Sequence, residues 1–72
     1  MKKEITVLKE ARKKIKLTQT DIAKELGVSR MTITYYENGQ MNPVAKDMYK
    51  IAKVYKLSNN EIATWIRQIS ED

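Results

Sequence analysis

Three short joints with one shared residue pattern divide this chain of 72 residues. Each joint has an apolar residue, a helix terminator, a second apolar residue and then a hydroxyl residue. The hydroxyl suits a helix N-cap because its oxygen can accept a hydrogen bond from a backbone N–H that otherwise has no partner. The pattern therefore predicts that one helix ends and another begins at each joint. The joints are Ile15-Lys16-Leu17-Thr18, Leu26-Gly27-Val28-Ser29 and Tyr55-Lys56-Leu57-Ser58.

Residues around the joints strengthen this prediction. An isoleucine follows the second apolar residue of each joint by five positions, which is the spacing of a hydrophobic staple. Two of the joints also have an acid three positions after the hydroxyl, as in a capping box. The staple pairs are Leu17 with Ile22, Val28 with Ile33 and Leu57 with Ile62, and the acids are Asp21 and Glu61.

The helix terminators differ in kind. Gly27 and Gly39 can adopt the left-handed conformation that commonly ends a helix. Lys16 and Lys56 stand at the equivalent position of the other two joints, where a side chain makes that conformation less favourable. We therefore expect mild backbone strain at both lysines or a different helix ending. A fourth helix start is predicted at Asn42 as the cap, with Pro43 at the first helical position.

The joints and the helical spacing of apolar residues predict an all-α protein that forms a single domain over residues 1–72. No alternating pattern long enough for a strand is present. The predicted helices cover residues 4–15, 19–26, 30–37, 43–55 and 59–70.

Composition excludes several classes of function. The chain has no cysteine and no histidine, which excludes disulfides and the usual zinc sites. It also lacks a glycine-rich phosphate loop, and its acids look like caps and surface charges, so we expect neither an enzyme nor a cofactor. The net charge of +5 suits a polyanionic partner. Without a signal peptide or a run of about 20 apolar residues, a soluble cytoplasmic protein with no membrane partner is expected.

A longer motif resembles the phage repressor and Cro family, also called the Xre family. It reads Gln19-x-x-x-Ala23-x-x-x-Gly27-x-Ser29, followed by Ile33 and Tyr36-Glu37-Asn38-Gly39, and the resemblance extends from Leu8 through Ile62. It implies a compact five-helix bundle like that of the lambda repressor, in which the second and third helices form a helix-turn-helix. Ala23, Gly27 and Ile33 suit the close helix crossing, the turn and the core anchor of that motif.

The third predicted helix has a solvent side unlike an ordinary surface, with scarcely any charge after its arginine. With Ile33 and Tyr36 pointing inward, its outer side presents Arg30, Met31, Thr34 and Tyr35; we call these four residues the recognition face. The resemblance implies that this face enters the major groove of DNA and contacts bases. Arg30 matches guanine O6 and N7 best. The alternatives are that Arg30 is simply solvated or contacts phosphate only, and that Tyr35 packs on a neighbouring side chain.

The resemblance also assigns supporting roles. Contacts with DNA phosphates are expected from residues around the third helix. They are Gln19 at the start of the second helix, Ser29, Asn38, Gln40 and Asn42 beside the third, and Lys46 near the start of the fourth. Glutamine at position 40, where a basic residue is frequent in the family, predicts a weaker or differently placed grip. Arg12 and Glu37 are expected to form a partly buried ion pair that orients the third helix. The alternative is two independently solvated charges.

The fifth predicted helix carries a complete apolar stripe, Ile62, Trp65, Ile66 and Ile69. Ile62 and part of Trp65 suit the core. A small domain cannot cover the whole stripe, so Trp65, Ile66 and Ile69 are candidates for a two-fold interface. We therefore predict a homodimeric, sequence-specific regulator of transcription that occupies a pseudo-palindromic double-stranded DNA operator, with no small-molecule ligand. An antitoxin or antirepressor whose main partner is another protein is the alternative.

Overall fold

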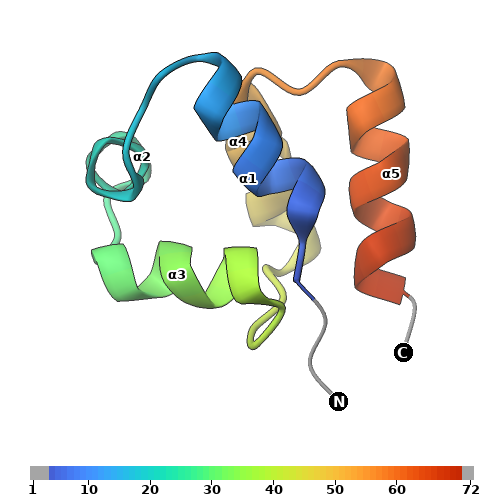
Figure 1. The fold of residues 1–72 in the computed structure, drawn as a ribbon. Coiled ribbons are helices and arrows are strands. Elements are labelled where there is room, and N and C mark those ends of the chain that lie inside the picture. The colour runs from blue at the N-terminus through green and yellow to red at the C-terminus, as the bar shows by residue number, and fades with distance from the viewer. Residues whose placement is uncertain (1–3, 71–72) are drawn as a thin grey trace.

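A computed structural model describes residues 4–70 of the chain. This part forms five α-helices and no strand, as the sequence predicted. In Figure 1, α3 lies across the lower part of the molecule, α2 is seen end-on above the left end of α3, and α5 stands upright at the right. No helix in the described part is both long and apolar enough to cross a membrane. The helices are α1 (Thr6–Lys14), α2 (Gln19–Leu26), α3 (Arg30–Asn38), α4 (Ala45–Tyr55) and α5 (Asn59–Ser70).

All three joints end their helix with the same pair of backbone hydrogen bonds. The terminator N–H bonds the carbonyl three residues back, and the next N–H bonds the carbonyl five residues back, as in a Schellman motif. The predicted capping boxes are present at Thr18 with Asp21 and at Ser58 with Glu61. Each joint thus closes one helix and opens the next locally. The hydrogen bonds that reach five residues back run from the backbone N–H to the carbonyl, from Leu17 to Arg12 (3.2 Å), from Val28 to Ala23 (3.0 Å) and from Leu57 to Ala52 (3.0 Å).

The two lysine terminators are left-handed, with φ of 58° at Lys16 and 56° at Lys56. An L-residue in this conformation costs roughly 1–2 kcal/mol, because its Cβ crowds the backbone. The Schellman hydrogen bonds require the conformation, so both lysines carry the strain that the sequence predicted. Gly27 and Gly39 occupy the same region without that cost.

Replacing Lys56 with glycine is therefore expected to stabilise the protein by up to about 1 kcal/mol. Glycine relieves the strain but also loses about 0.5–1 kcal/mol more conformational entropy on folding. Urea denaturation followed by circular dichroism measures the change in the free energy of unfolding. Lys53→Gly, inside the last turn of α4, is the control and should destabilise by about 1 kcal/mol. A destabilising Lys56→Gly would contradict the strain.

Two helices begin later than predicted. The first starts at Thr6 instead of residue 4, because the backbone N–H of Ile5 donates to the carbonyl of Glu37 (2.8 Å) and holds the chain outside the helix. The fourth starts at Ala45 instead of Pro43. Val44 takes the cap position with an extended backbone, and its carbonyl accepts the first helical bonds, so Asn42 is not the cap. Residues 39–44 connect the end of α3 to the start of α4.

One hydrophobic core lies between the helices. The helix-turn-helix contributes Ile22, Ala23 and Ile33, none more than 4% exposed. Helix α2 packs against α3 and α4, and α5 packs mainly against α1. The remaining buried apolar residues are Ile5, Val7, Leu8, Ala11, Ile51, Tyr55 and Trp65.

Trp65 corrects one prediction about α5. Its side chain is 1% exposed and belongs to the core, so it has no surface to offer to a second copy. A large aromatic side chain buries more apolar area than any neighbour on this helix, which explains its inward position. Ile69 is half-buried against the core, whereas Ile66 is 49% exposed. The candidate interface on α5 is thus reduced to Ile66 and the exposed part of Ile69.

Candidate nucleic-acid interface

The recognition face lies on α3, on the side opposite Ile33. Ile33 is fully buried and fixes how α3 rotates about its axis. Ser29 caps the helix by accepting a hydrogen bond from the backbone N–H of Thr32. Arg30 and Met31 are exposed as a result, while Thr34 and Tyr35 are half-buried. The first turn of α3 is therefore its most accessible part.

A buried carboxylate holds α3 from behind. Glu37 is 0% exposed and lies at the end of α3. Arg12 of α1 donates to both of its oxygens, from Nε to Oε2 (2.8 Å) and from Nη2 to Oε1 (3.0 Å). Tyr55 of α4 donates to Oε2 (2.6 Å), and Gln19 of α2 donates to Oε1 (3.1 Å). The expected ion pair is therefore present as a two-pronged contact within a wider network, and four helices meet at one side chain.

These contacts set the protonation of the network. Burial alone would raise the pKa of Glu37, but hydrogen bonds from Arg12, Tyr55 and Gln19 outweigh it, and this pKa is lowered. The pKa of Tyr55 is strongly raised, first by burial and then by its bond to the Glu37 carboxylate. The hydrogen bond with Glu37 raises the pKa of Arg12 against the effect of burial. Near neutral pH the network holds an ionised Glu37, a charged Arg12 and a neutral Tyr55.

Gln19 connects this network to the recognition face. Its Nε2 donates to Glu37, and its Oε1 accepts from the Thr34 hydroxyl (2.9 Å) and from Nη1 of Arg30 (3.4 Å). The Thr34 hydroxyl also lies 3.3 Å from the backbone oxygen of Arg30. The sequence predicted Gln19 as a phosphate contact and Thr34 as a base contact. Both side chains have partners inside the protein, which the sequence did not indicate.

The other predicted phosphate contacts fall into two groups around α3. Ser29 stands at the start of the helix, with its hydroxyl on Thr32. The second group surrounds the end of the helix and the start of α4. There the Asn38 amide donates to the Gln40 side chain (3.2 Å). The members of this group are Asn38, Gln40, Asn42 and Lys46, and all but Asn38 are exposed.

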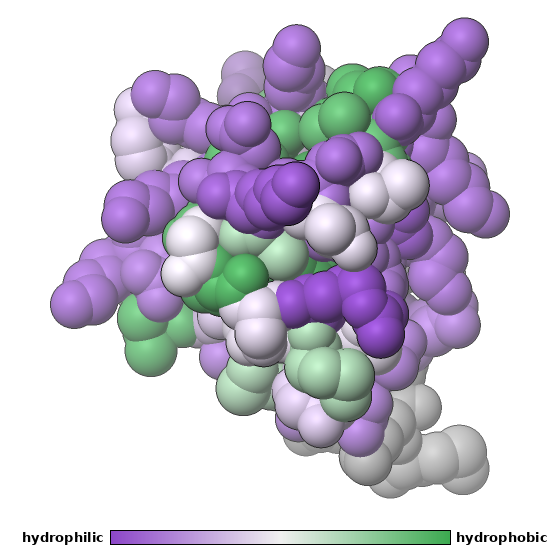
Figure 2. All heavy atoms as spheres, turned by 90° about the vertical axis from the view of Figure 1, so that its left-hand side faces the viewer, coloured by the Kyte–Doolittle hydropathy of each residue, from purple (hydrophilic) through white to green (hydrophobic). Residues whose placement is uncertain are grey.

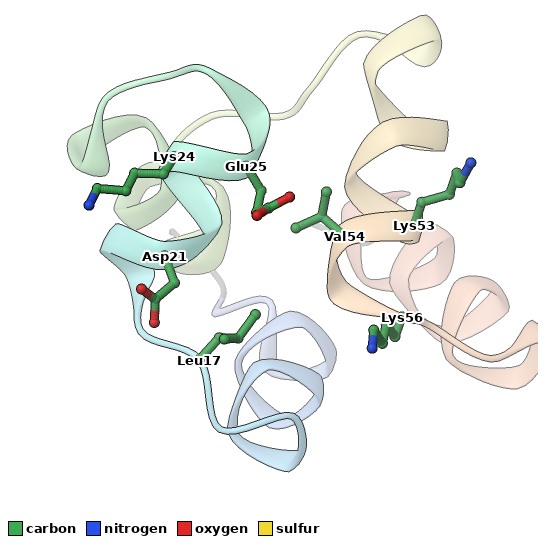
Figure 3. Close-up of a pocket in the computed structure, with 7 residues that line it drawn as sticks. All are labelled: Leu17, Asp21, Lys24, Glu25, Lys53, Val54 and Lys56. Atoms are coloured by element: carbon green, nitrogen blue, oxygen red, sulfur yellow. The ribbon is translucent and has the colours of Figure 1, made fainter.

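The surface on the side of α2 is mostly hydrophilic and broken by a few apolar side chains (Figure 2). An open groove of about 550 Å³ lies between α2 and α4. In Figure 3, Glu25 and Val54 face each other across it, and Lys24 and Lys53 extend outward. None of the predicted DNA contacts lines this groove. It is therefore separate from the recognition face.

Tyr55 is the member of the network to which sequence reasoning assigned no functional role. Its position in the helical pattern of α4 predicted an apolar core residue, and its ring is indeed fully buried. A buried tyrosine hydroxyl needs a hydrogen-bond partner, and that need was the available signal. The partner lies 18 residues away, at Glu37. Apolar spacing along one helix does not reveal such a partner.

Residues 8–62 match the protein-family model described as Helix-turn-helix. The chain belongs to this family. Its relatives include a protein of Archaeoglobus fulgidus that bears the name uncharacterized HTH-type transcriptional regulator. The two are 44% identical over 57 residues, which are 79% of this chain and 80% of the relative. No solved structure matches the chain significantly.

Two further relatives come from a phage and a bacterium. The ImmF control region 10 kDa protein of Bacillus phage phi105 is 35% identical over 71 residues, covering 99% of this chain and 79% of that protein. The HTH-type transcriptional regulator DicA of Escherichia coli is 34% identical over 61 residues, covering 85% of this chain and 42% of DicA. The chain is thus a helix-turn-helix protein of the DNA-binding, transcription-regulating class.

Proposed function

We propose that this helix-turn-helix protein binds double-stranded DNA sequence-specifically by inserting the recognition face of α3 into the major groove. The exposed first turn of α3 carries the proposal. There Arg30 and Met31 project from a helix whose opposite side is locked by Ile33 and Glu37. A rigid helix with an exposed arginine at its start matches the way helix-turn-helix proteins read base edges. The net charge of +5 supports attraction to the phosphate backbone.

Within this function, Arg30 is the main base reader. Its guanidinium group has no carboxylate within salt-bridge distance among residues 4–70, and its one side-chain hydrogen bond there, from Nη1 to Gln19, is long (3.4 Å), which leaves its other donors for guanine O6 and N7. Met31 and Tyr35 supply apolar contacts to thymine methyl groups. The exposed group of Gln40, Asn42 and Lys46 contacts phosphates beyond the end of α3, and Ser29 and the start of α2 contact them on the other side.

Selection of binding sites from random duplexes tests this function. We expect one enriched sequence, which binds the protein at least about 10³-fold more tightly than random duplex. Arg30→Ala should weaken binding to that sequence by about 1–3 kcal/mol while changing binding to random duplex much less. Lys24→Ala, an exposed change on α2, is the control. Equal binding to all sequences, or an unchanged preference in Arg30→Ala, would contradict the proposal.

The protein further acts as a homodimer through α5. Ile66 exposes 49% of its surface next to the half-buried Ile69, an apolar patch that a two-fold contact would cover. Two copies related in this way would place their α3 helices about 34–36 Å apart and would read a pseudo-palindromic operator. The selected sequences should therefore contain two inverted half-sites one helical turn apart.

Replacing Ile66 with aspartate is expected to dissociate the dimer, because it would bury an unpaired charge at the contact. Sedimentation equilibrium should then report a monomer, and affinity for the full operator should fall toward that for one half-site. The fold should persist because Ile66 lies outside the core. Asn60→Asp adds the same charge at an exposed position of α5 and should leave the dimer intact. An unchanged dimer in Ile66→Asp would show that the interface lies elsewhere.

A further inference from the structure

A continuous chain of side-chain hydrogen bonds runs from the core to the recognition face. It starts at Tyr55 of α4, whose hydroxyl donates to Oε2 of Glu37. The other carboxylate oxygen accepts from Nε2 of Gln19, and Oε1 of Gln19 accepts from the hydroxyl of Thr34 and from Arg30. We call these five residues the relay. Its two ends differ sharply in exposure, since Tyr55 is fully buried and Arg30 is exposed.

The direction of every bond in the relay follows from Glu37. An ionised carboxylate can only accept hydrogen bonds, so Gln19 must turn its NH₂ group toward it. The carbonyl oxygen of Gln19 then faces Thr34 and Arg30 as an acceptor. The Thr34 hydroxyl consequently donates inward, and only its methyl group and its oxygen lone pairs remain for DNA. A buried charge in the core thus determines which hydrogen-bonding groups the recognition face presents.

Tyr55 helps to hold the carboxylate in the orientation that this arrangement needs. Arg12 holds Glu37 from α1, and the short bond from Tyr55 (2.6 Å) fixes the same group from α4. No buried side-chain polar atom in the described part of the chain lacks a hydrogen-bond partner, so the network is fully satisfied. A fully satisfied network keeps one geometry, whereas a partly satisfied one can rotate.

We propose that Tyr55 is a positioning residue for base reading, which acts through Glu37 and Gln19 on Thr34 and Arg30. This inference rests on the proposed function. Without the Tyr55 hydroxyl, Glu37 loses a donor and can turn, and the Gln19 amide loses its single fixed orientation. Arg30 and Thr34 then sample more side-chain conformations before they meet DNA. Ordering these two side chains when DNA binds then costs more free energy. This cost weakens the sequence-specific complex more than the non-specific one, because non-specific binding depends on charge and phosphate contacts and not on base contacts.

The test compares affinity for the selected operator with affinity for random duplex at one salt concentration. Tyr55→Phe removes only the hydroxyl and leaves the ring in the core. It should lower the ratio of the two affinities by about 3- to 10-fold, the scale of one ordinary hydrogen bond, because the effect reaches the DNA indirectly. Tyr49→Phe, a hydroxyl deletion on the same helix at a tyrosine that is 70% exposed, should leave the ratio unchanged. A purely structural defect would reduce both affinities together, because both depend on the same folded fraction.

A second variant tests the route of the effect. Gln19→Met removes the amide that links Glu37 to the recognition face and should also lower the ratio. If Tyr55 acts through Gln19, the double variant should be no worse than Gln19→Met alone, so the two effects should not multiply. An unchanged ratio in Tyr55→Phe, or two effects that multiply, would overturn the inference.

Nuclear magnetic resonance of the free protein separates this inference from the proposed function. In Tyr55→Phe the side-chain amide signals of Gln19 and the Thr34 signals should shift, while Tyr49→Phe should leave them in place. Unchanged Gln19 and Thr34 signals in Tyr55→Phe would overturn the relay whatever the DNA measurements show. If the signals shift in Tyr55→Phe but the wild-type protein prefers no DNA sequence, the relay stands and the proposed function is overturned. The role of Tyr55 in base reading falls with it.

Discussion

Replacing Arg12 with methionine is expected to destabilise the protein by about 3–5 kcal/mol at neutral pH, which is most of the stability of a domain this small. Methionine keeps much of the apolar stem of the side chain but removes both donors to Glu37. The carboxylate is 0% exposed and would be left with Tyr55 and Gln19 as partners but with no opposite charge. An ionised group without its counter-charge in the core strongly favours unfolding.

The loss should depend on pH in a characteristic way. In the wild type the pKa of Glu37 is lowered, so its stabilising contribution is present above the unfolded carboxyl pKa of about 4.3 and is lost as the pH falls through the folded value. In Arg12→Met burial should dominate and raise that pKa above the unfolded value. Protonation of Glu37 then favours the folded variant as the pH falls. The difference in stability between the two proteins should therefore shrink from pH 7 toward pH 4.

Urea denaturation at several pH values measures this difference. Lys13→Met removes a charge from the exposed neighbouring position of α1 and serves as the matched control, with an expected change within about 0.5 kcal/mol at all pH values. A loss below about 1 kcal/mol in Arg12→Met, or a loss that does not change with pH, would show that Glu37 is not the reason for the effect.

The second large effect is expected at Trp65, where substitution by alanine should destabilise by about 3–5 kcal/mol. Trp65 is 1% exposed and is among the largest fully buried side chains of the core. Helix α5 packs chiefly on α1, and the polar bonds between them lie at the ends, where Lys14 meets Glu61 and where Gln68 meets Thr6 and the backbone N–H of Val7. The exposed contacts of Lys14 and Thr6 contribute little, and the part-buried bond from Val7 is a single hydrogen bond of about 1 kcal/mol. The indole is thus the main attachment of α5 to the rest of the molecule.

Thermal unfolding followed by circular dichroism tests this prediction. Tryptophan fluorescence cannot be used, because the substitution removes the only tryptophan of the chain. Trp65→Phe should fall between wild type and alanine, since it leaves a smaller cavity. Ile66→Ala, the adjacent exposed position, should change the free energy of unfolding by less than about 1 kcal/mol when measured at concentrations where the protein is monomeric. Equal losses at Trp65 and Ile66 would contradict the assignment of Trp65 to the core.

Much of the fold was predictable because the joints encode it locally. The caps at Thr18 and Ser58 and the left-handed residues at Gly27 and Lys56 bond only to residues within five positions of themselves. Such contacts depend on the local sequence around each joint and not on the rest of the fold. Helices α2 and α5 accordingly have the predicted ends. The starts of α1 and α4 differ, since Ile5 is held by a carbonyl 32 positions further along the chain and Val44 takes the place of Asn42.

The candidate site was predictable only in part. The exposure of Arg30 and Met31 follows from the helical period once Ile33 is taken as the buried side. The inward roles of Gln19 and Thr34 do not follow, because a glutamine or a threonine on a helix surface can equally face water. Their partners come from other helices, and the distance along the chain between Gln19 and Glu37 is 18 residues.

The sequence by itself determined where the helices of the repeated joints end and begin, the all-α class and the helix-turn-helix, since each depends on contacts within a turn or two of helix. Only the tertiary structure decided that Trp65 belongs to the core and that Tyr55 and Gln19 meet at Glu37. Both depend on which faces of different helices come together. A buried charge needs all its partners at once, and only the packed arrangement of α1, α2, α3 and α4 brings them to one carboxylate.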